Sequence, residues 1–265
     1  MKVRHSHRIA DIGPDSWNAL AHPSPVADYA WQRTMEEVNP SKGETGYWWI
    51  EDEKGAVAAV AGYLETGNPL HGNADRQRYG PMARTVRSLR SILQPRPTLV
   101  CGAQFSPGNP VLVRDGLGPE ARGITSERLL EAVEAYCRAR RINLYFFSML
   151  RNDTVLDERF SGRGYLKAPG LPNTVLDIRW DSWEAYLDHL KVNHPSTEKS
   201  IRSQVNRGRR DGVVIEEVDD PSVCEEDIHR ILTEHYYRKN QRRLSLDPHF
   251  PSMLRENMGD GALIY

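Results

Sequence analysis

Residues 121–149 read ARGITSERLLEAVEAYCRARRINLYFFSM, and this stretch says most about the fold. Its apolar residues recur every three or four positions, at Leu129, Leu130, Val133, Tyr136 and Cys137. That spacing predicts a helix from Ser126 to Arg140, capped by Thr125 or Ser126. The nearly continuous apolar run from Asn143 to Leu150 then predicts a strand that is covered on both faces. A helix that leads directly into a buried strand is typical of an α/β layer structure.

Upstream of this stretch, the pattern predicts four strands and a helix at Asp28 to Val38. Glu65 to Pro97 is rich in Gly, Arg and polar residues, which favours a loop with one short helix near Arg84 to Leu93. Asp52 to Gly55 has the composition of a tight turn between the first two of the strands. The predicted strands are Gly46 to Glu51, Ala56 to Leu64, Thr98 to Ala103 and Val111 to Val113.

Downstream, strand and helix patterns continue to alternate. Asp181 heads a capping box, Pro195 suits the first helical position, and Gly212 suits a left-handed helix end. The predicted helices are Ser182 to Lys191, Pro195 to about Asp211, Cys224 to Asn240, and Asp247 to about Asn257. The predicted strands are Thr174 to Trp180, Val213 to Val218, and a beginning at Ala262 to Tyr265. The whole chain is therefore expected to be α/β or α+β, with a mixed sheet flanked by helices.

Composition excludes several classes of protein. The chain has 265 residues, with 35 Lys and Arg against 36 Asp and Glu, so bulk attraction to nucleic acid is not implied and no DNA partner is expected. Its three cysteines lie far apart with no metal-binding spacing, which favours a reduced compartment and no metal. No signal-like or membrane-spanning apolar run occurs, so we expect a soluble cytoplasmic protein without a membrane span.

A local excess of basic residues occurs in KSIRSQVNRGRRDGVVIEEV, residues 199–218. On a helix, Ile201 and Val205 share the inward face, and the cations spread over the rest of the surface. Arg is the residue for bidentate binding of phosphate or carboxylate, but no aromatic residue is interleaved for stacking bases. The stretch therefore indicates either a site for anions in general or only the solvated face of a helix. The candidate anion contacts are Lys199, Arg202, Arg209 and Arg210.

The second half of the chain resembles a known family. LDIRWDSWEAYLDHLKVNHPSTEKSIRSQVNRGRRDGVVIEEV, followed by HRILTEHYYRKNQRRLSLDPHFPSMLREN, is similar to the segment that joins the two halves of Fem-type transferases and related GNAT-like acyltransferases. The stretch 121–149 resembles the GNAT core unit of anion-binding turn, helix and strand. In that comparison Glu120 and Thr125 occupy turn positions at which an acid and a Cβ would oppose a pyrophosphate. The resemblance implies that the first domain keeps the fold and has lost the coenzyme.

The resemblance implies that the chain is organised as a tandem of two domains. Residues 1–178 would form a first GNAT-like domain without an intact coenzyme turn. Residues 179–265 would supply connector helices and the start of an incomplete second GNAT-like domain. The acceptor would lie in a cleft of one domain, and the activated donor would approach the other.

The resemblance also implies a reaction, the transfer of an acyl or aminoacyl group to an amine. The donor would be acyl-CoA or aminoacyl-tRNA, acting as a co-substrate rather than a permanently bound cofactor. The acceptor would be a small molecule or a compound like a peptidoglycan precursor. Such transfer needs a neutral amine and donors for the oxyanion, and it requires neither a metal nor a covalent intermediate. No catalytic base is assigned. The alternative is a non-catalytic GNAT-fold protein that binds a sugar, a peptide or a protein.

Several other residues have both a functional and a structural interpretation. Asp75, Arg76, Arg78 and Tyr79 lie where the family comparison places the acceptor, or they belong to a solvated loop. His5 and His7 lack a third metal ligand. Either Trp48 or Trp49 should face the core, which would leave the other free to line a cleft. The remaining residues, expected to be structural, are His229, His235 and Cys137.

Overall fold

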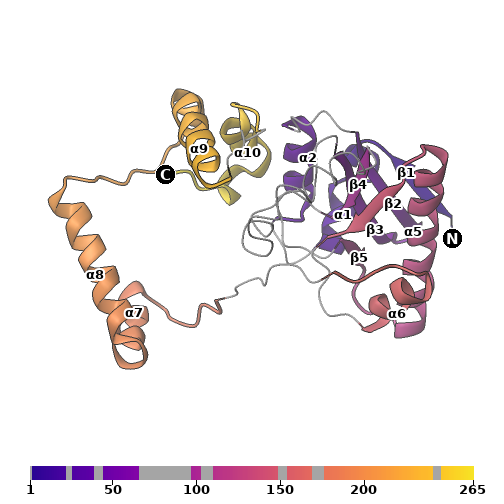
Figure 1. The fold of residues 1–265 in the computed structure, drawn as a ribbon, viewed down its shortest axis with the longest axis horizontal. Coiled ribbons are helices and arrows are strands. Elements are labelled where there is room, and N and C mark those ends of the chain that lie inside the picture. The colour runs from indigo at the N-terminus through magenta and orange to yellow at the C-terminus, as the bar shows by residue number, and fades with distance from the viewer. Residues whose placement is uncertain are drawn as a thin grey trace, which may run out of the picture. The chain divides into compact units, whose positions relative to one another are not determined.

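The computed structural model describes residues 2–21, 26–38, 44–65, 97–102, 110–148, 154–168, 176–240 and 246–265. Within these ranges the chain is mixed α/β, with eight α-helices and one open six-stranded sheet (Figure 1). It divides into two compact units. The sheet unit comprises Met1–Leu171 and Asp220–Ala262, and the hairpin unit comprises Pro172–Asp219 and Leu263–Tyr265. The predicted fold class is confirmed at this level, whereas a tandem of GNAT-like domains divided at residue 178 stays a prediction.

The sheet of the first unit has the order β1-β2-β3-β4-β6, and β5 pairs with β3 beside this path. All pairs are antiparallel except β4 and β6, which run parallel with Thr98 opposite Leu144. A parallel pair needs a crossover, and the helix α5 provides it. The strands are β1 (Val3–Ser6), β2 (Thr45–Asp52), β3 (Gly55–Glu65), β4 (Thr98–Cys101), β5 (Val111–Val113) and β6 (Leu144–Phe147).

The hairpin of β2 and β3 forms where the turn chemistry predicted it. Gly55 has a φ of +107°, a left-handed conformation that glycine adopts without steric cost. Trp48 and Trp49 alternate across β2, so their side chains lie on opposite faces of the sheet. Trp48 is 1% exposed and Trp49 is 5% exposed, and each belongs to the hydrophobic cluster on its own face. The idea that one of the two tryptophans lines a cleft is therefore wrong, because the sheet is covered on both faces.

One face of the sheet is covered by α5 (Pro119–Ala139), and α6 (Thr154–Gly162) packs beside it. The apolar positions of α5 lie in the core as their spacing predicted. Its start differs, because Gly118 is the N-cap and both Thr125 and Ser126 are buried inside the helix. The predicted cap is therefore wrong, and residues 120–125 are helical rather than a turn. β6 was predicted to be covered on both faces, but it is an edge strand with half-buried side chains.

The other face is covered by α1 (Pro14–Ala21), which follows the short 3-10 helix η1 (Ile9–Asp11). The next helix, α2 (Tyr29–Glu37), matches its predicted range. The Asp28 side chain caps it by accepting a 2.8 Å hydrogen bond from the Trp31 N–H. Side chains from α1 and β2 meet in this second cluster, where the indole of Trp17 lies edge-on to Tyr47 with 5.6 Å between ring centroids.

The second half of the chain is helical. Ser182, rather than Asp181, caps α7. Three predicted strands are wrong, since the described parts of 174–180, 213–218 and 262–265 contain no strand. The described helices are α7 (Trp183–Asn193), α8 (Pro195–Arg210), α9 (Glu225–Asn240) and α10 (Phe250–Met258), with 3-10 helices η3 (Pro221–Val223) and η4 (Gly259–Gly261). In the described ranges no helix is both long enough and apolar enough to cross a membrane.

A partial repetition of helix order occurs along the described chain, since a 3-10 helix and two α-helices follow one another both as η1, α1, α2 and as η3, α9, α10. The first half begins β1, η1, α1, α2, β2, and β1 pairs antiparallel with β2. The second half runs from segment 213–218 through η3, α9 and α10 to segment 262–265. One backbone hydrogen bond of 2.8 Å, from the Val218 N–H to the Ile264 carbonyl, joins these two segments.

Within the sheet unit, the second helices of the two repetitions pack on each other (Figure 1). The Asn257 amide of α10 donates hydrogen bonds to Glu37 Oε2 at 2.8 Å and to Thr34 Oγ1 at 3.2 Å in α2. Trp31 and Phe250 lie edge to face, with 6.5 Å between ring centroids. α2 is therefore covered by a segment more than two hundred residues away in sequence.

Candidate anion-binding site

The basic stretch forms α8, whose ends are fixed by local chemistry. Pro195 occupies its first turn, where a missing N–H costs nothing. At the other end, Gly212 has a φ of +72° and donates a hydrogen bond to the Arg209 carbonyl. Val213 donates another to the Gly208 carbonyl at 2.9 Å, which completes a Schellman motif. The last turn of α8 is therefore a defined structure that carries Arg209 and Arg210.

Arg202, one of the four predicted anion contacts, already has a partner. Its Nε donates to the carboxylate of Glu198, one helical turn earlier. Glu198 is only 7% exposed, although it is charged. A buried carboxylate needs a compensating cation, so the guanidinium of Arg202 serves the stability of α8 first. The i,i+4 spacing of this pair is a sequence signal that could have identified it.

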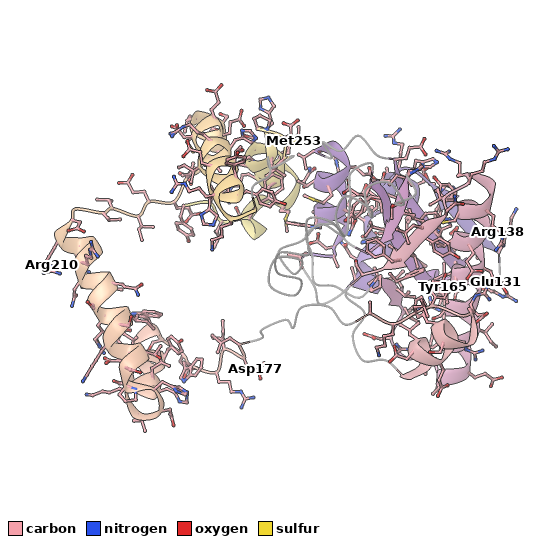
Figure 2. All side chains as sticks on the ribbon, in the orientation of Figure 1. Glu131, Arg138, Tyr165, Asp177, Arg210 and Met253 are labelled. Carbon is pink, nitrogen blue, oxygen red and sulfur yellow. The ribbon has the colours of Figure 1, made fainter. Side chains whose placement is uncertain are left out.

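Lys199, Arg209 and Arg210 remain available. All three are exposed, and none has an ion pair with another residue in the described parts of the chain. Figure 2 shows Arg210 at the end of α8. Lys199 lies about 15 Å from the two arginines along the helix axis. Cations in a last turn also complement the helix dipole, so Arg209 and Arg210 have a structural role in addition.

This arrangement can bind anions but has no other chemistry of its own. Each of the two guanidinium groups offers a fork of donors that suits a phosphate or a carboxylate. Arg207, next to them, is engaged with Asp211 at 3.6 Å. The other predicted substrate contacts, Arg76, Arg78 and Tyr79, lie outside the described residues, as does Asp75.

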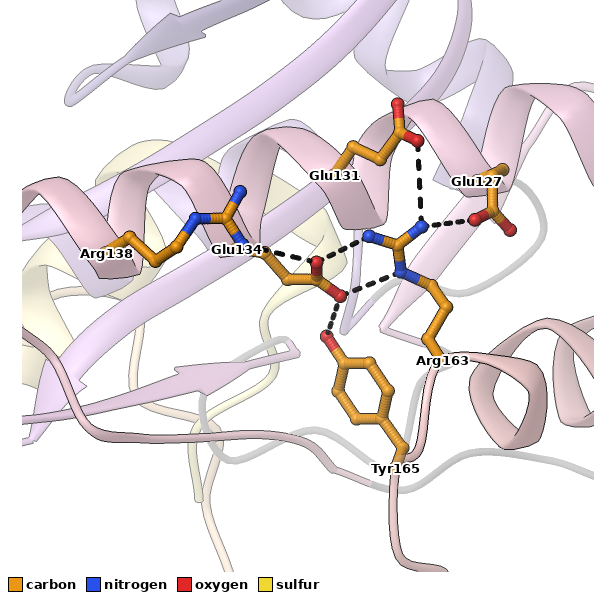
Figure 3. Close-up of polar contacts among 6 residues, drawn as sticks. All are labelled: Glu127, Glu131, Glu134, Arg138, Arg163 and Tyr165. Atoms are coloured by element: carbon orange, nitrogen blue, oxygen red, sulfur yellow. Dashed lines mark hydrogen bonds and ion pairs between the residues drawn. The ribbon is translucent and has the colours of Figure 1, made fainter.

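A second cluster of charged groups lies in the sheet unit, between α5 and the turn after α6 (Figure 3). The Arg163 guanidinium donates to both oxygens of Glu134, at 2.8 and 2.5 Å. It also contacts Glu127 and lies 3.6 Å from Glu131. The Tyr165 hydroxyl donates to Glu134 at 3.1 Å. Sequence reasoning missed this cluster, because its members are about thirty positions apart and follow no motif.

The electrostatics of this cluster indicate a structural clamp. Hydrogen bonds from Arg163 are the main cause that lowers the pKa of Glu134, and Glu134 in turn raises the pKa of Arg163. Burial raises the pKa of Tyr165. A carboxylate held ionised by two partners is a poor general acid. Glu134 therefore fastens α5 to the chain after α6 and is not a candidate for proton transfer.

Histidines gather at the edge of the sheet. The rings of His5 and His7 lie 4.8 Å apart, and His5 is 5.0 Å from Tyr136 between ring centroids. His7 Nδ1 donates to the Thr45 carbonyl at 2.6 Å. Burial, followed by the nearby charges of His7 and Arg140, lowers the pKa of His5, which Glu44 partly offsets. Over the described residues, no group of three or more His, Cys, Asp or Glu side chains could hold a metal ion.

The lowered pKa of His5 predicts a loss of stability in acid. Its folded pKa lies below the unfolded value of 6.5, so the unfolded chain binds more protons at this site between the two values. The free energy of unfolding should fall as the pH drops from 7 through this window. We expect His5→Asn to flatten this slope in urea unfolding at several pH values. Equal slopes in wild type and His5→Asn would contradict the prediction.

The remaining candidates have ordinary structural positions. His229 is half-buried and lies 2.9 Å from the Leu246 carbonyl, and His235 is exposed. Cys137 is buried in the core, where burial raises the pKa of its thiol to about 12. His229 Nε2 also lies 3.5 Å from the hydroxyl oxygen of Thr233, one turn along α9, and Cys137 is inert, as expected. No protein-family model, no curated protein and no solved structure matches this chain.

Proposed function

We propose that the protein is a GNAT-like transferase of the Fem type, which moves an acyl or aminoacyl group to an amine. The repeated order of elements carries the proposal, because a tandem transferase holds acceptor and donor on two domains of the same kind. The mixed sheet flanked by helices and the packing of α2 on α10 agree with such a tandem. Three exposed cations on α8, unpaired within the described residues, suit an anionic donor.

In the proposed reaction, the amine nitrogen attacks the carbonyl carbon of the donor and forms a tetrahedral oxyanion. The oxyanion collapses, and a C–N bond replaces the thioester C–S bond of acyl-CoA or the ester C–O bond of aminoacyl-tRNA. The CoA thiolate or the tRNA ribose oxygen leaves, and a base carries the amine proton to it. Lys199, Arg209 and Arg210 would hold donor phosphates. We also propose a cytoplasmic location, since Cys101, Cys137 and Cys224 are free thiols.

Charge reversal at the end of α8 tests the proposal. We expect Arg209→Glu/Arg210→Glu to weaken binding of the preferred donor by about tenfold or more, which corresponds to roughly 1.4 kcal/mol. The probes are acetyl-CoA, aminoacyl-tRNA and a nucleotide-linked peptidoglycan precursor, titrated by calorimetry at low and high salt. Wild-type binding should weaken with salt, since exposed charges are screened.

Val192→Gln, an exposed change on α7, is the matched control and should bind as the wild type does. Unchanged binding of every probe by the doubly reversed variant would remove α8 from the donor site. Binding without transfer to any amine would instead support the alternative, a non-catalytic GNAT-fold binding protein.

A further inference from the structure

The segment Val213–Val218, with the sequence VVIEEV, is an unusual surface. Val213, Val214 and Ile215 are 61%, 74% and 78% exposed, although β-branched residues favour strands. The chain leaves α8 here as an extended run (Figure 1). In an extended chain Val213 and Ile215 share one face and Val214 lies on the other, so both faces present exposed aliphatic side chains, which commonly mark places where another polypeptide binds.

Among the described residues, the backbone N–H groups of this segment are engaged only at its two ends. Val218 donates to the Ile264 carbonyl, and Val213 donates to Gly208 at the end of α8. Residues 214–217 have no backbone N–H partner among the described residues. In an extended chain, alternate peptide groups point to opposite sides. Ile215 and Glu217 therefore direct their N–H and C=O groups away from Ile264, and an open edge of this kind can pair with a further strand.

The charged residues on either side of the aliphatic side chains indicate which partner would pair with this segment. The basic end of α8, with Arg209 and Arg210, precedes the apolar residues, and Glu216, Glu217 and Asp219 follow them. None of these five forms an ion pair within the described part of the chain. A parallel neighbour of the same sequence would bring like charges together. An antiparallel copy would place the basic end of each chain beside the acidic end of the other, which makes the stretch its own complement.

We propose that the segment Val213–Val218 pairs antiparallel with the same segment of a second copy of this chain, and so forms a two-fold symmetric dimer. A two-fold axis requires that the contact be the same in both directions. With Ile215 opposite Ile215 of the partner subunit, Val213 lies opposite Glu217 of the partner subunit, so no two carboxylates of the segment Val213–Val218 face each other across the ladder. The proposal does not depend on the transferase function.

Complementary charge reversals test this dimer. Light scattering after size exclusion should give the wild type a mass of about 60 kDa, twice the 30.2 kDa of one chain. Arg209→Glu/Arg210→Glu alone should be monomeric, because acidic ends then meet acidic ends. Glu216→Arg/Glu217→Arg alone should be monomeric for the opposite reason. A mixture of the two variants should recover the dimer, since each altered end then meets its complement.

Three results would overturn the proposal: a wild type that is monomeric at every concentration tested, a dimer formed by either doubly substituted variant on its own, or a mixture of the two variants that stays monomeric. Lys199→Glu changes charge on α8 away from the segment and should leave the dimer intact. Hydrogen exchange of residues 214–217 adds a second readout, with protection expected in the wild type and lost in both variants. The Glu216→Arg/Glu217→Arg variant keeps Arg209 and Arg210, so its donor binding separates this proposal from the proposed function.

Discussion

Arg163→Ala is expected to lower the free energy of unfolding at pH 7 by about 3–5 kcal/mol, the usual cost of leaving a buried charge without its partner. The side chain of Glu134 is only 9% exposed, and Arg163 donates to both of its oxygens. The Tyr165 hydroxyl donates only one hydrogen bond to Glu134, and Arg138 Nη1 lies 3.7 Å from Glu134 Oε2. Neither can replace the bidentate guanidinium of Arg163. Urea unfolding followed by circular dichroism measures the change.

The pKa of Glu134 predicts how the free energy of unfolding changes with pH in the wild type and in Arg163→Ala. In the wild type the pKa of Glu134 is lowered, so its contribution is present above the unfolded pKa and is lost as the pH falls through the folded value. Without Arg163, burial should raise the pKa of Glu134, and mild acid should then partly restore stability to the variant. Glu134→Gln in the Arg163→Ala background should also recover part of the loss.

Arg138→Ala is the matched control, because the Arg138 side chain is 70% exposed and contributes only a surface ion pair. A loss of less than about 1 kcal/mol is expected for it. If Arg163→Ala were as mild as Arg138→Ala, the clamp between α5 and the chain after α6 would not stabilise the fold.

Trp17→Ala is the second change with a large expected effect, a loss of about 3–5 kcal/mol. Trp17 is fully buried beneath the sheet, its indole N–H donates to the Ala27 carbonyl at 2.8 Å, and its ring meets Tyr47 edge-on. Alanine would leave a cavity and also an unsatisfied carbonyl. Thermal and urea unfolding of the purified variant would measure the loss.

Trp17→Phe separates the two contributions. Phenylalanine keeps most of the apolar volume and removes the hydrogen bond, so a smaller loss of about 1–2 kcal/mol is expected. Equal losses for the two substitutions would mean that the indole N–H, rather than the packing of the ring, dominates.

Elements with strong local signals could be predicted from sequence. α2 follows Asp28, whose side chain caps it, and α8 ends at Gly212, which takes the left-handed conformation the pattern required. The β2–β3 hairpin turns at Gly55 for the same kind of reason. In each case residues within a few positions determine the backbone conformation, and the tertiary fold agrees with this local preference.

Features set by distant contacts could not be predicted. The position of α1 is fixed in part by burial of Trp17 against Tyr47. The extra turns at the start of α5 depend on burial of Thr125 and Ser126. Segment 213–218 has the composition of a strand, yet composition cannot supply a neighbour, and a strand exists only with one. At the candidate site, exposure of Arg209 and Arg210 followed from the pattern, whereas the engagement of Arg202 depended on how deeply Glu198 is buried.

The packing of α10 on α2 limits how this protein can be divided for separate study. Thr34 is fully buried, and Asn257 of α10 reaches both it and Glu37. A fragment that stops soon after α6 would contain every strand of the sheet and would still lack this cover. Its exposed α2 would favour self-association, so a dissection that keeps residues 220–262 is the sounder starting point for expression of the sheet unit.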